Sequence, residues 1–111
     1  MAQFVFLYRR GEAIPAESPA QMQARMQRWQ AWFKDLAERG HLKDRGMPLE
    51  HSGAVATKQN VTDGPYAEKD LVMGYSLIEA RDLAQASELS SRCPIIGDSN
   101  GCVEVRPVLN L

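Results

Sequence analysis

Hydrophobic and polar positions predict two long β-strands in this chain. Residues 3–8 and 72–79 carry apolar side chains at most positions, so both faces of each strand are expected to be apolar. Gly74, inside the second segment, indicates a bulge or a close approach of another backbone. Shorter strands are predicted at 55–57, extending towards residue 61, and at 102–108.

A helix is predicted after the first strand, beyond a loop at 9–17. Ser18 caps this helix, Pro19 suits its first position, and Gln21 completes a capping box. Gly40 supplies the left-handed residue that ends it. Apolar side chains recur at spacings of three and four and form one stripe that is expected to lie in the core: Met22, Met26, Trp29, Phe33 and Leu36.

A second helix is predicted from its cap at Asp82 to Cys93, because Pro94 disfavours helical backbone at the residue before it. Residues 41–52 and 95–101 are expected to be loops. The order β-α-β-β-α-β predicts an α+β fold, the ferredoxin-like plait, with an antiparallel sheet and two helices on one face. Monomers rarely expose an apolar patch as large as the second face. We therefore expect a homodimer packed sheet to sheet.

Composition narrows the class of protein. The 111 residues are 44% hydrophobic and 24% charged, which predicts one globular domain over 1–111. The net charge of -1 argues against direct nucleic acid binding. No apolar run approaches the roughly 20 residues that cross a bilayer. The first residues, 1–4, show neither a basic region nor a long apolar segment, so secretion is not expected. We therefore expect a cytoplasmic protein that does not bind a membrane.

Cys93 and Cys102 are the two cysteines, and they do not form a C-x-x-C pair. Both histidines, His41 and His51, lie far from them in sequence, so no metal site is expected. The sequence also contains no glycine-rich phosphate loop, and no cofactor is expected. Spacing leaves a disulfide between the two cysteines open. Reduced thiols that pack as small hydrophobic side chains are the favoured interpretation.

Several segments jointly resemble the YCII-related family, in particular its DGPF subgroup. The resemblance spans nearly the whole chain and is carried by the segments 4–8, 26–42, 62–68, 74–80, 92–94 and 103–108. The segment 62–68 reads Thr-Asp-Gly-Pro-Tyr-Ala-Glu, with Tyr66 where the subgroup has Phe. The resemblance implies a plait of the dimeric α/β barrel type.

What the resemblance implies about function is less specific. Some relatives look like small enzymes that use a His–Asp pair for acid–base chemistry, with the histidine on the first helix. Residues 19–39 contain no histidine, so that mechanism is not carried over. Other relatives are fused to sigma factors or act near them, which implies a regulatory or ligand-sensing role.

Asp63 is the leading candidate for a functional residue, as a general base or a ligand acceptor beside the Asp-Gly-Pro turn. The alternative is that its oxygens only bind the backbone of the turn. His51 is the second catalytic candidate, because an imidazole side chain is suited to proton transfer near neutral pH, although a solvated loop histidine is the simpler interpretation.

Tyr66, Arg106 and Tyr8 are the candidate ligand-binding residues. Packing of the Tyr66 ring is the simpler interpretation for that residue. For Arg106, which shares a strand face with Glu104, the simpler interpretation is an interstrand or intersubunit ion pair. The sequence thus predicts a homodimeric domain that binds a small organic molecule near the Asp63 turn. A lyase or isomerase using acid–base chemistry and an accessory module in sigma-factor-linked regulation are the alternatives.

Overall fold

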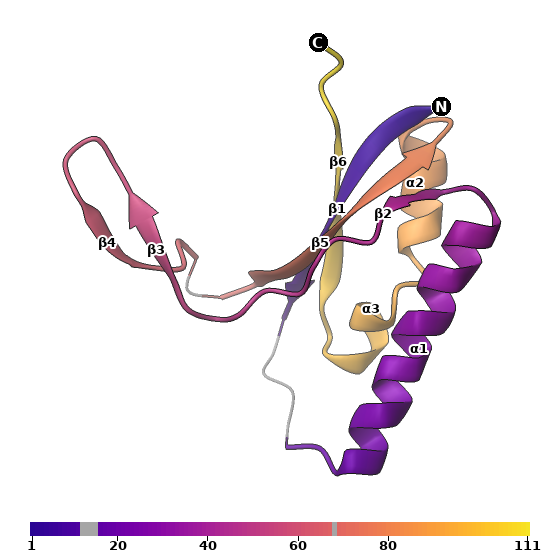
Figure 1. Cartoon of the computed structure of the whole chain (residues 1–111), viewed down its shortest axis with the longest axis horizontal. Helices are drawn as coiled ribbons and strands as arrows, with labels where there is room; N and C mark the ends of the chain where they lie inside the picture. Colours follow the sequence, from indigo (N-terminus) through magenta and orange to yellow (C-terminus); the bar gives the residue numbers. More distant parts are fainter. Residues whose placement is uncertain (12–15, 68) are drawn as a thin grey trace.

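The computed structural model describes residues 1–11, 16–67 and 69–111. Part of the predicted loop at 9–17 and Glu68 of the Asp-Gly-Pro segment lie outside these ranges. Figure 1 labels the elements, which in chain order are β1 (Ala2–Arg10), α1 (Pro19–Glu38), β2 (Leu42–Asp44), β3 (Gly53–Ala56), β4 (Val61–Gly64), β5 (Leu71–Ala80), α2 (Leu83–Ser90), α3 (Pro94–Asp98) and β6 (Cys102–Pro107).

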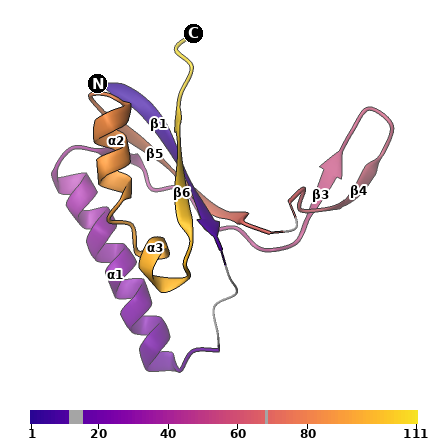
Figure 2. The same cartoon turned by 180° about the vertical axis from the view of Figure 1, so that it is seen from behind.

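Four strands form one antiparallel sheet in the order β2-β5-β1-β6. The three helices lie on the same side of this sheet, as the two opposite views in Figures 1 and 2 show. The predicted α+β class and ferredoxin-like plait are therefore confirmed, with the two long strands in the middle of the sheet. Within the described residues, no helix is long and apolar enough to cross a membrane.

The local signals at both ends of α1 act as the sequence predicts. The Ser18 side chain accepts a hydrogen bond from the Gln21 backbone N–H, and the Gln21 side chain accepts one from the Ser18 N–H. At the other end, Gly40 has φ of 79°. There the N–H of His41 donates to the carbonyl of Leu36, and that of Gly40 to Ala37. This is a Schellman motif, which needs a residue in the left-handed region.

The second strand of the plait is not where the sequence placed it. The segment 41–52, predicted to be a loop, contains β2, which pairs with β5 at Leu42 and Asp44. The predicted strand at 55–57 corresponds to β3, which pairs with β4 in a separate two-stranded sheet. Among the described elements, β3 and β4 contact only each other. The three residues of β2 carry little hydrophobic periodicity, so the sequence pattern favoured a strand at 55–57 instead.

Smaller differences concern the second helix and Gly74. The helix predicted to reach Cys93 ends at Ser90, and the segment expected to be a loop contains the short helix α3. Gly74 lies at a register shift between β1 and β5, and a Cβ on it would lie 3.2 Å from the Met47 carbonyl oxygen. The predicted bulge and close approach are both found there.

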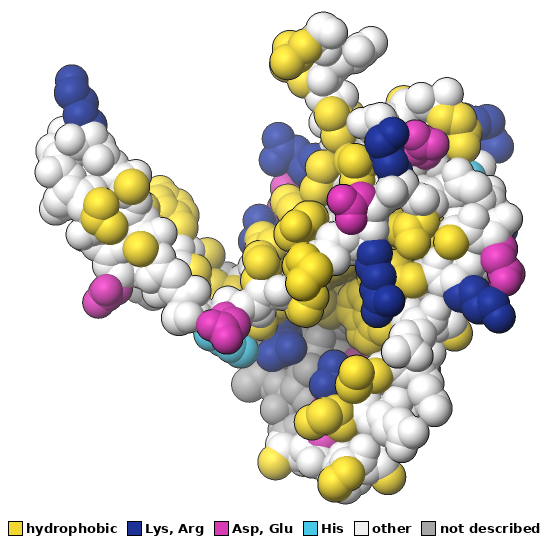
Figure 3. Space-filling view, in the orientation of Figure 1, with side chains coloured by type: hydrophobic (Ala, Val, Ile, Leu, Met, Phe, Trp, Pro, Cys, Tyr) yellow, Lys and Arg dark blue, Asp and Glu magenta, His cyan; other side chains and the backbone are white. Residues whose placement is uncertain are grey.

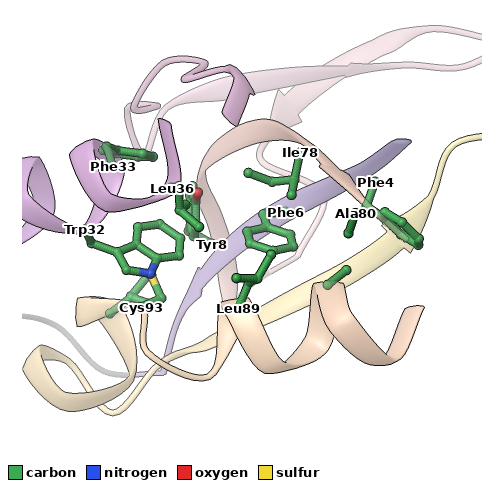
Figure 4. Close-up of a cluster of buried hydrophobic side chains, with 12 residues drawn as sticks. Phe4, Phe6, Tyr8, Trp32, Phe33, Leu36, Ile78, Ala80, Leu89 and Cys93 are labelled. Carbon is green, nitrogen blue, oxygen red and sulfur yellow. The ribbon is translucent and has the colours of Figure 1, made fainter. Parts of the chain in front are cut away.

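The core lies between the helices and one face of the sheet. Phe4, Phe6 and Tyr8 of β1 point to this side and pack against α1 and α2, as Figure 4 shows. Trp32 and Leu36 of α1 belong to this cluster. The other members are buried side chains from α1, β5, α2 and the segment around α3: Phe33, Ile78, Ala80, Ala86, Leu89, Cys93 and Ile95.

The opposite face of the sheet is not covered by any described helix. Strand alternation and register place Val5 and Leu7 of β1 on this face, beside Leu77 and Tyr75 of β5. Tyr75 is 41% exposed. The β3–β4 hairpin projects from the same side of the sheet, away from the helices (Figures 1 and 2).

Candidate functional site

A cavity of about 350 Å³ opens between the first half of α1 and one end of the sheet. Its side walls are the segment 45–48, which runs beside β5, and the α3 segment. Figure 3 shows hydrophobic and basic side chains gathered in the region between α1 and the base of the hairpin. The lining within the described residues is Tyr8, Arg10, Met22, Arg25, Met26, Trp29, Gln30, Phe33, Arg45, Gly46, Met47, Pro48, Met73, Gly74, Tyr75, Ile95, Asp98 and Ser99.

The first half of the predicted apolar stripe on α1 lines this cavity and is not part of the core. Met22 and Met26 are 46% and 51% exposed, whereas Phe33 and Leu36 further along the helix are buried. The prediction that the whole stripe is core is therefore wrong for its first two residues. The sheet that α1 covers does not extend beneath them.

Methionine is concentrated at this cavity. Four of the five methionines in the chain line it, and they come from α1 (Met22, Met26), the 45–48 segment (Met47) and β5 (Met73). Methionine side chains are unbranched and polarisable, so they adapt to flat ligands of different outline. Trp29 adds an aromatic wall, with its ring 5.1 Å from the Tyr8 ring and perpendicular to it.

One wall is fixed by a chain of two hydrogen bonds, the first buried and the second partly buried. The Tyr8 hydroxyl donates to Ser76 Oγ at 2.7 Å, and Ser76 Oγ donates to the Arg45 carbonyl at 2.6 Å. Burial raises the pKa of Tyr8, so its hydroxyl stays protonated. Gly46 follows with φ of 72°, and a Cβ on it would lie 1.8 Å from the Tyr75 carbonyl oxygen. Only glycine allows this segment to lie so close to β5.

The polar groups at the cavity are mostly basic. Arg10, Arg25 and Arg45 line it, against the single carboxylate of Asp98 among the described lining residues. Arg25 is paired with Glu17 at 3.1 Å. The Arg45 guanidinium lies 4.8 Å from the centre of the Phe33 ring. Asp98 Oδ1 accepts a hydrogen bond from Arg28 at 2.8 Å. This excess of positive charge favours an anionic occupant.

The structure does not bring the predicted site residues together. Tyr8 lines the cavity, with its hydroxyl already bound to Ser76. Asp63 is exposed on β4, paired in register with Ala54, and it is not among the lining residues. His51 is exposed before β3, and Tyr66 is 90% exposed after the hairpin.

Arg106 lies on the open face of the sheet, where its Nη1 is 3.6 Å from Glu104. Arg9 binds the same carboxylate at 2.9 Å, and this hydrogen bond is the main reason that the pKa of Glu104 is lowered. The ion pair that joins two strands here is therefore the one between Arg9 and Glu104, while Arg106 contacts Glu104 within β6. Neither residue lines the cavity among the described residues.

Sequence reasoning missed Arg10 and Asp98. A signal for Arg10 was present, because it is two residues beyond Tyr8 and strand alternation places it on the same face as Phe6 and Tyr8. A charged residue that continues an aromatic face indicates the rim of a pocket. No comparable signal marks Asp98, because the short helix that carries it was expected to be a loop.

Other chemistry is limited at the described residues. Cys93 and Cys102 are both free thiols. Burial raises the pKa of Cys93 to about 12, which keeps it protonated and unreactive, while Cys102 is exposed on β6. His41 is buried, and its Nδ1 lies 2.8 Å from the Glu79 carbonyl oxygen. The described residues form no cluster of three or more side chains suited to a metal ion.

Comparisons with known proteins give a family and a fold. The family model of the YCII-related domain matches residues 1–111. No curated protein matches the chain. Among solved structures, the chain is similar to 5-chloro-2-hydroxyhydroquinone dehydrochlorinase (TftG) from Burkholderia phenoliruptrix AC1100, in complex with 2,5-dihydroxybenzoquinone. The TM-score is 0.50 at 14% sequence identity, over 98% of this chain and 95% of that one. At this identity, the similarity supports the fold alone.

Proposed function

Because the chain belongs to the YCII-related domain family, we propose that it is a homodimeric domain that binds a small organic molecule with a flat apolar body. The ligand lies in the cavity between α1 and the sheet. The observation that carries this proposal is a preformed cavity of about 350 Å³, which is within the usual size range of small-molecule sites.

The character of the lining supports a flat ligand. Trp29, Phe33 and four methionines provide apolar and aromatic surface, while a few polar groups lie at the edges. This combination of a mainly apolar wall and few directed polar groups is typical of ligand pockets. The dihydroxybenzoquinone bound to TftG is a single flat ring, and a ring of that size is the kind of occupant that we propose here.

The test is to fill the cavity and measure binding. We expect phenol or benzoate to bind the wild-type protein in isothermal titration calorimetry. Met26→Trp places an indole in the cavity and is expected to weaken binding at least about tenfold. Gln27→Trp is the matched control, because Gln27 is exposed on the same helix and does not line the cavity. Equal binding by both variants, with both folded, would contradict the proposal.

The open face of the sheet supports the dimer. Val5, Leu7, Leu77 and Tyr75 form its apolar centre, and the Arg9–Glu104 ion pair lies beside them. An apolar centre with a polar rim is the usual anatomy of a subunit interface. The β3–β4 hairpin projects on this side and contacts no other described helix or strand. An isolated two-stranded hairpin is marginally stable in water, so we propose that each hairpin packs on the other subunit.

A charge on the open face tests the dimer. Leu77→Lys is expected to convert the dimer into particles of the 12.4 kDa subunit mass, as measured by light scattering, because a dimer would have to bury the unpaired ammonium group. Leu83→Lys is the control, because Leu83 is 49% exposed on α2, on the helix side. A wild-type protein that is already monomeric and folded at micromolar concentration would refute the dimer.

Acid–base catalysis by Asp63 and His51 is a separate proposal. Both residues belong to the hairpin region and lie outside the cavity lining of their own subunit. The proposal therefore requires the hairpin to reach the cavity of the second subunit. Ligand affinity that is the same for Asp63→Asn and for the wild-type protein would count against any role of Asp63 at the ligand.

A further inference from the structure

We propose that Arg10 and Asp98 together select a ligand that carries an acidic oxygen and a hydroxyl group on one flat ring, such as a hydroxylated aromatic acid. This inference rests on the proposed function, because it assigns a ligand class to the same cavity. It is carried by two buried polar atoms that the structure leaves without a hydrogen-bond partner.

These two atoms are Arg10 Nε and Asp98 Oδ2. Both are buried, and neither has a hydrogen-bond partner among the described residues. Both residues line the cavity, Arg10 from the end of β1 and Asp98 from α3. Buried polar atoms almost always have a partner in a native protein. The two atoms are therefore expected to find their partners in what occupies the cavity.

The chemistry of the two atoms is complementary. Arg10 Nε carries a hydrogen and can only donate, so its partner must be an acceptor. The other Asp98 oxygen, Oδ1, accepts from Arg28 at 2.8 Å, which fixes the carboxylate and leaves Oδ2 to accept from a donor. One ligand that meets both demands presents an acceptor to Arg10 and a hydroxyl or amino hydrogen to Asp98.

The charges of the lining residues indicate whether the ligand acceptor at Arg10 is anionic or neutral. The lining contains three arginines and one carboxylate among the described residues, and that carboxylate is paired with Arg28. Arg10 and Arg45 make no side-chain hydrogen bond to another described side chain or backbone group, while Arg25 is paired with Glu17. An anionic acceptor such as a carboxylate or phenolate suits this surplus of donors better than a neutral carbonyl. The Trp29 and Phe33 rings favour a flat body for the same ligand.

The experiment compares four kinds of probe by calorimetry: benzoate, phenol, the three positional isomers of hydroxybenzoate, and their methyl ethers. Benzoate has the acceptor alone, and the ethers keep the shape of the ring substituent without its donor. We expect one hydroxybenzoate isomer to bind the wild-type protein roughly tenfold to a hundredfold more tightly than benzoate or its own methyl ether, as for a hydrogen bond to a charged group.

Two variants assign the effect to its residue. Asp98→Asn replaces the acceptor by an amide and is expected to abolish the preference for hydroxybenzoate over its ether. Benzoate should bind at least as tightly as it does to the wild-type protein, because the substitution removes a negative charge from the lining. Arg28→Gln is the matched control, because it breaks the same ion pair but keeps the Asp98 carboxylate, and it should retain the preference. Arg10→Gln is expected to lower the affinity for every carboxylate probe at least about tenfold and to leave the affinity for phenol unchanged. Circular dichroism checks that each variant is folded.

The outcomes separate this inference from the proposed function. One outcome is that benzoate or phenol binds the wild-type protein, that Met26→Trp weakens this binding, and that no hydroxybenzoate isomer binds more tightly than its methyl ether. In that case the cavity binds ligands, but Arg10 and Asp98 do not select them. The inference then fails alone. A preference that survives Asp98→Asn also overturns it. If no probe binds the wild-type protein, both the inference and the proposed function fail.

Discussion

The hydrogen-bond chain through Ser76 makes a quantitative prediction for the wall of the cavity. Ser76 and Tyr8 are 0% and 4% exposed, and the Ser76 hydroxyl both accepts from Tyr8 and donates to the Arg45 carbonyl. Ser76→Ala removes the Ser76 hydroxyl group. The buried Tyr8 hydroxyl then lacks its acceptor, and the Arg45 carbonyl lacks its donor. A buried unsatisfied group costs about 1–3 kcal/mol, and the Arg45 carbonyl costs less because its hydrogen bond is only partly buried. We therefore expect a loss of roughly 2–4 kcal/mol in the free energy of unfolding.

A second substitution separates this cause from a simple packing defect. Tyr8→Phe removes the donor alone and is expected to cost about 1 kcal/mol in the wild-type background. In the Ser76→Ala background, the same change removes an unpaired hydroxyl and should be neutral or stabilising. The double-mutant cycle therefore predicts a coupling of about 1 kcal/mol or more.

The assay is urea unfolding followed by tryptophan fluorescence. All variants are compared at one protein concentration, because dimerisation would shift the apparent stability. The reasoning is refuted if Ser76→Ala costs less than about 0.5 kcal/mol, or if Tyr8→Phe costs the same in both backgrounds. Since Ser76 also anchors the 45–48 segment, Ser76→Ala should weaken benzoate binding as well.

Three further predictions concern single residues. Gly40→Ala should destabilise the protein by about 1 kcal/mol, because Gly40 has φ of 79° in the motif that ends α1. Gly97→Ala is its control and should be neutral or stabilising in the same melting experiment, because Gly97 has open space around it and no positive φ. In the native protein, a thiol reagent should modify exposed Cys102 and spare buried Cys93. Burial raises the pKa of Cys93 to about 12, so the unfolded chain ionises first at alkaline pH. Stability from this thiol should be complete below about pH 8 and fall as the pH rises towards 12. Cys93→Ala should reduce this alkaline loss, as measured by urea unfolding at each pH, and an unchanged pH profile would contradict the assignment.

The order of the main elements could be predicted because their signals are local. The capping box at Ser18, the positive φ at Gly40 and the alternation of β1 and β5 each depend on neighbouring residues, and all are found in the structure. The position of β2 could not be predicted, because its three residues form a strand only by pairing with β5. Such a tertiary contact leaves no periodic pattern in the sequence.

The candidate site was predicted less well, for a different reason. A stripe of apolar residues on a helix shows which face is apolar, but it does not show where the sheet beneath that face ends. Met22 and Met26 therefore look like core residues in sequence and line a cavity in the structure. Asp63, His51 and Tyr66 were chosen for their chemistry, and their roles, like an association with sigma factors, stay predictions.

The most direct test of the central claim, that the cavity beside α1 holds the ligand, uses the five methionines as probes. Methyl NMR spectra of protein labelled at the methionine methyl groups are recorded while hydroxybenzoate is added. Met22, Met26, Met47 and Met73 line the cavity, and Met1 does not. The account predicts that those four signals shift together with one affinity, while the Met1 signal stays in place. Five unchanged signals, or a shift at Met1 alone, would contradict it.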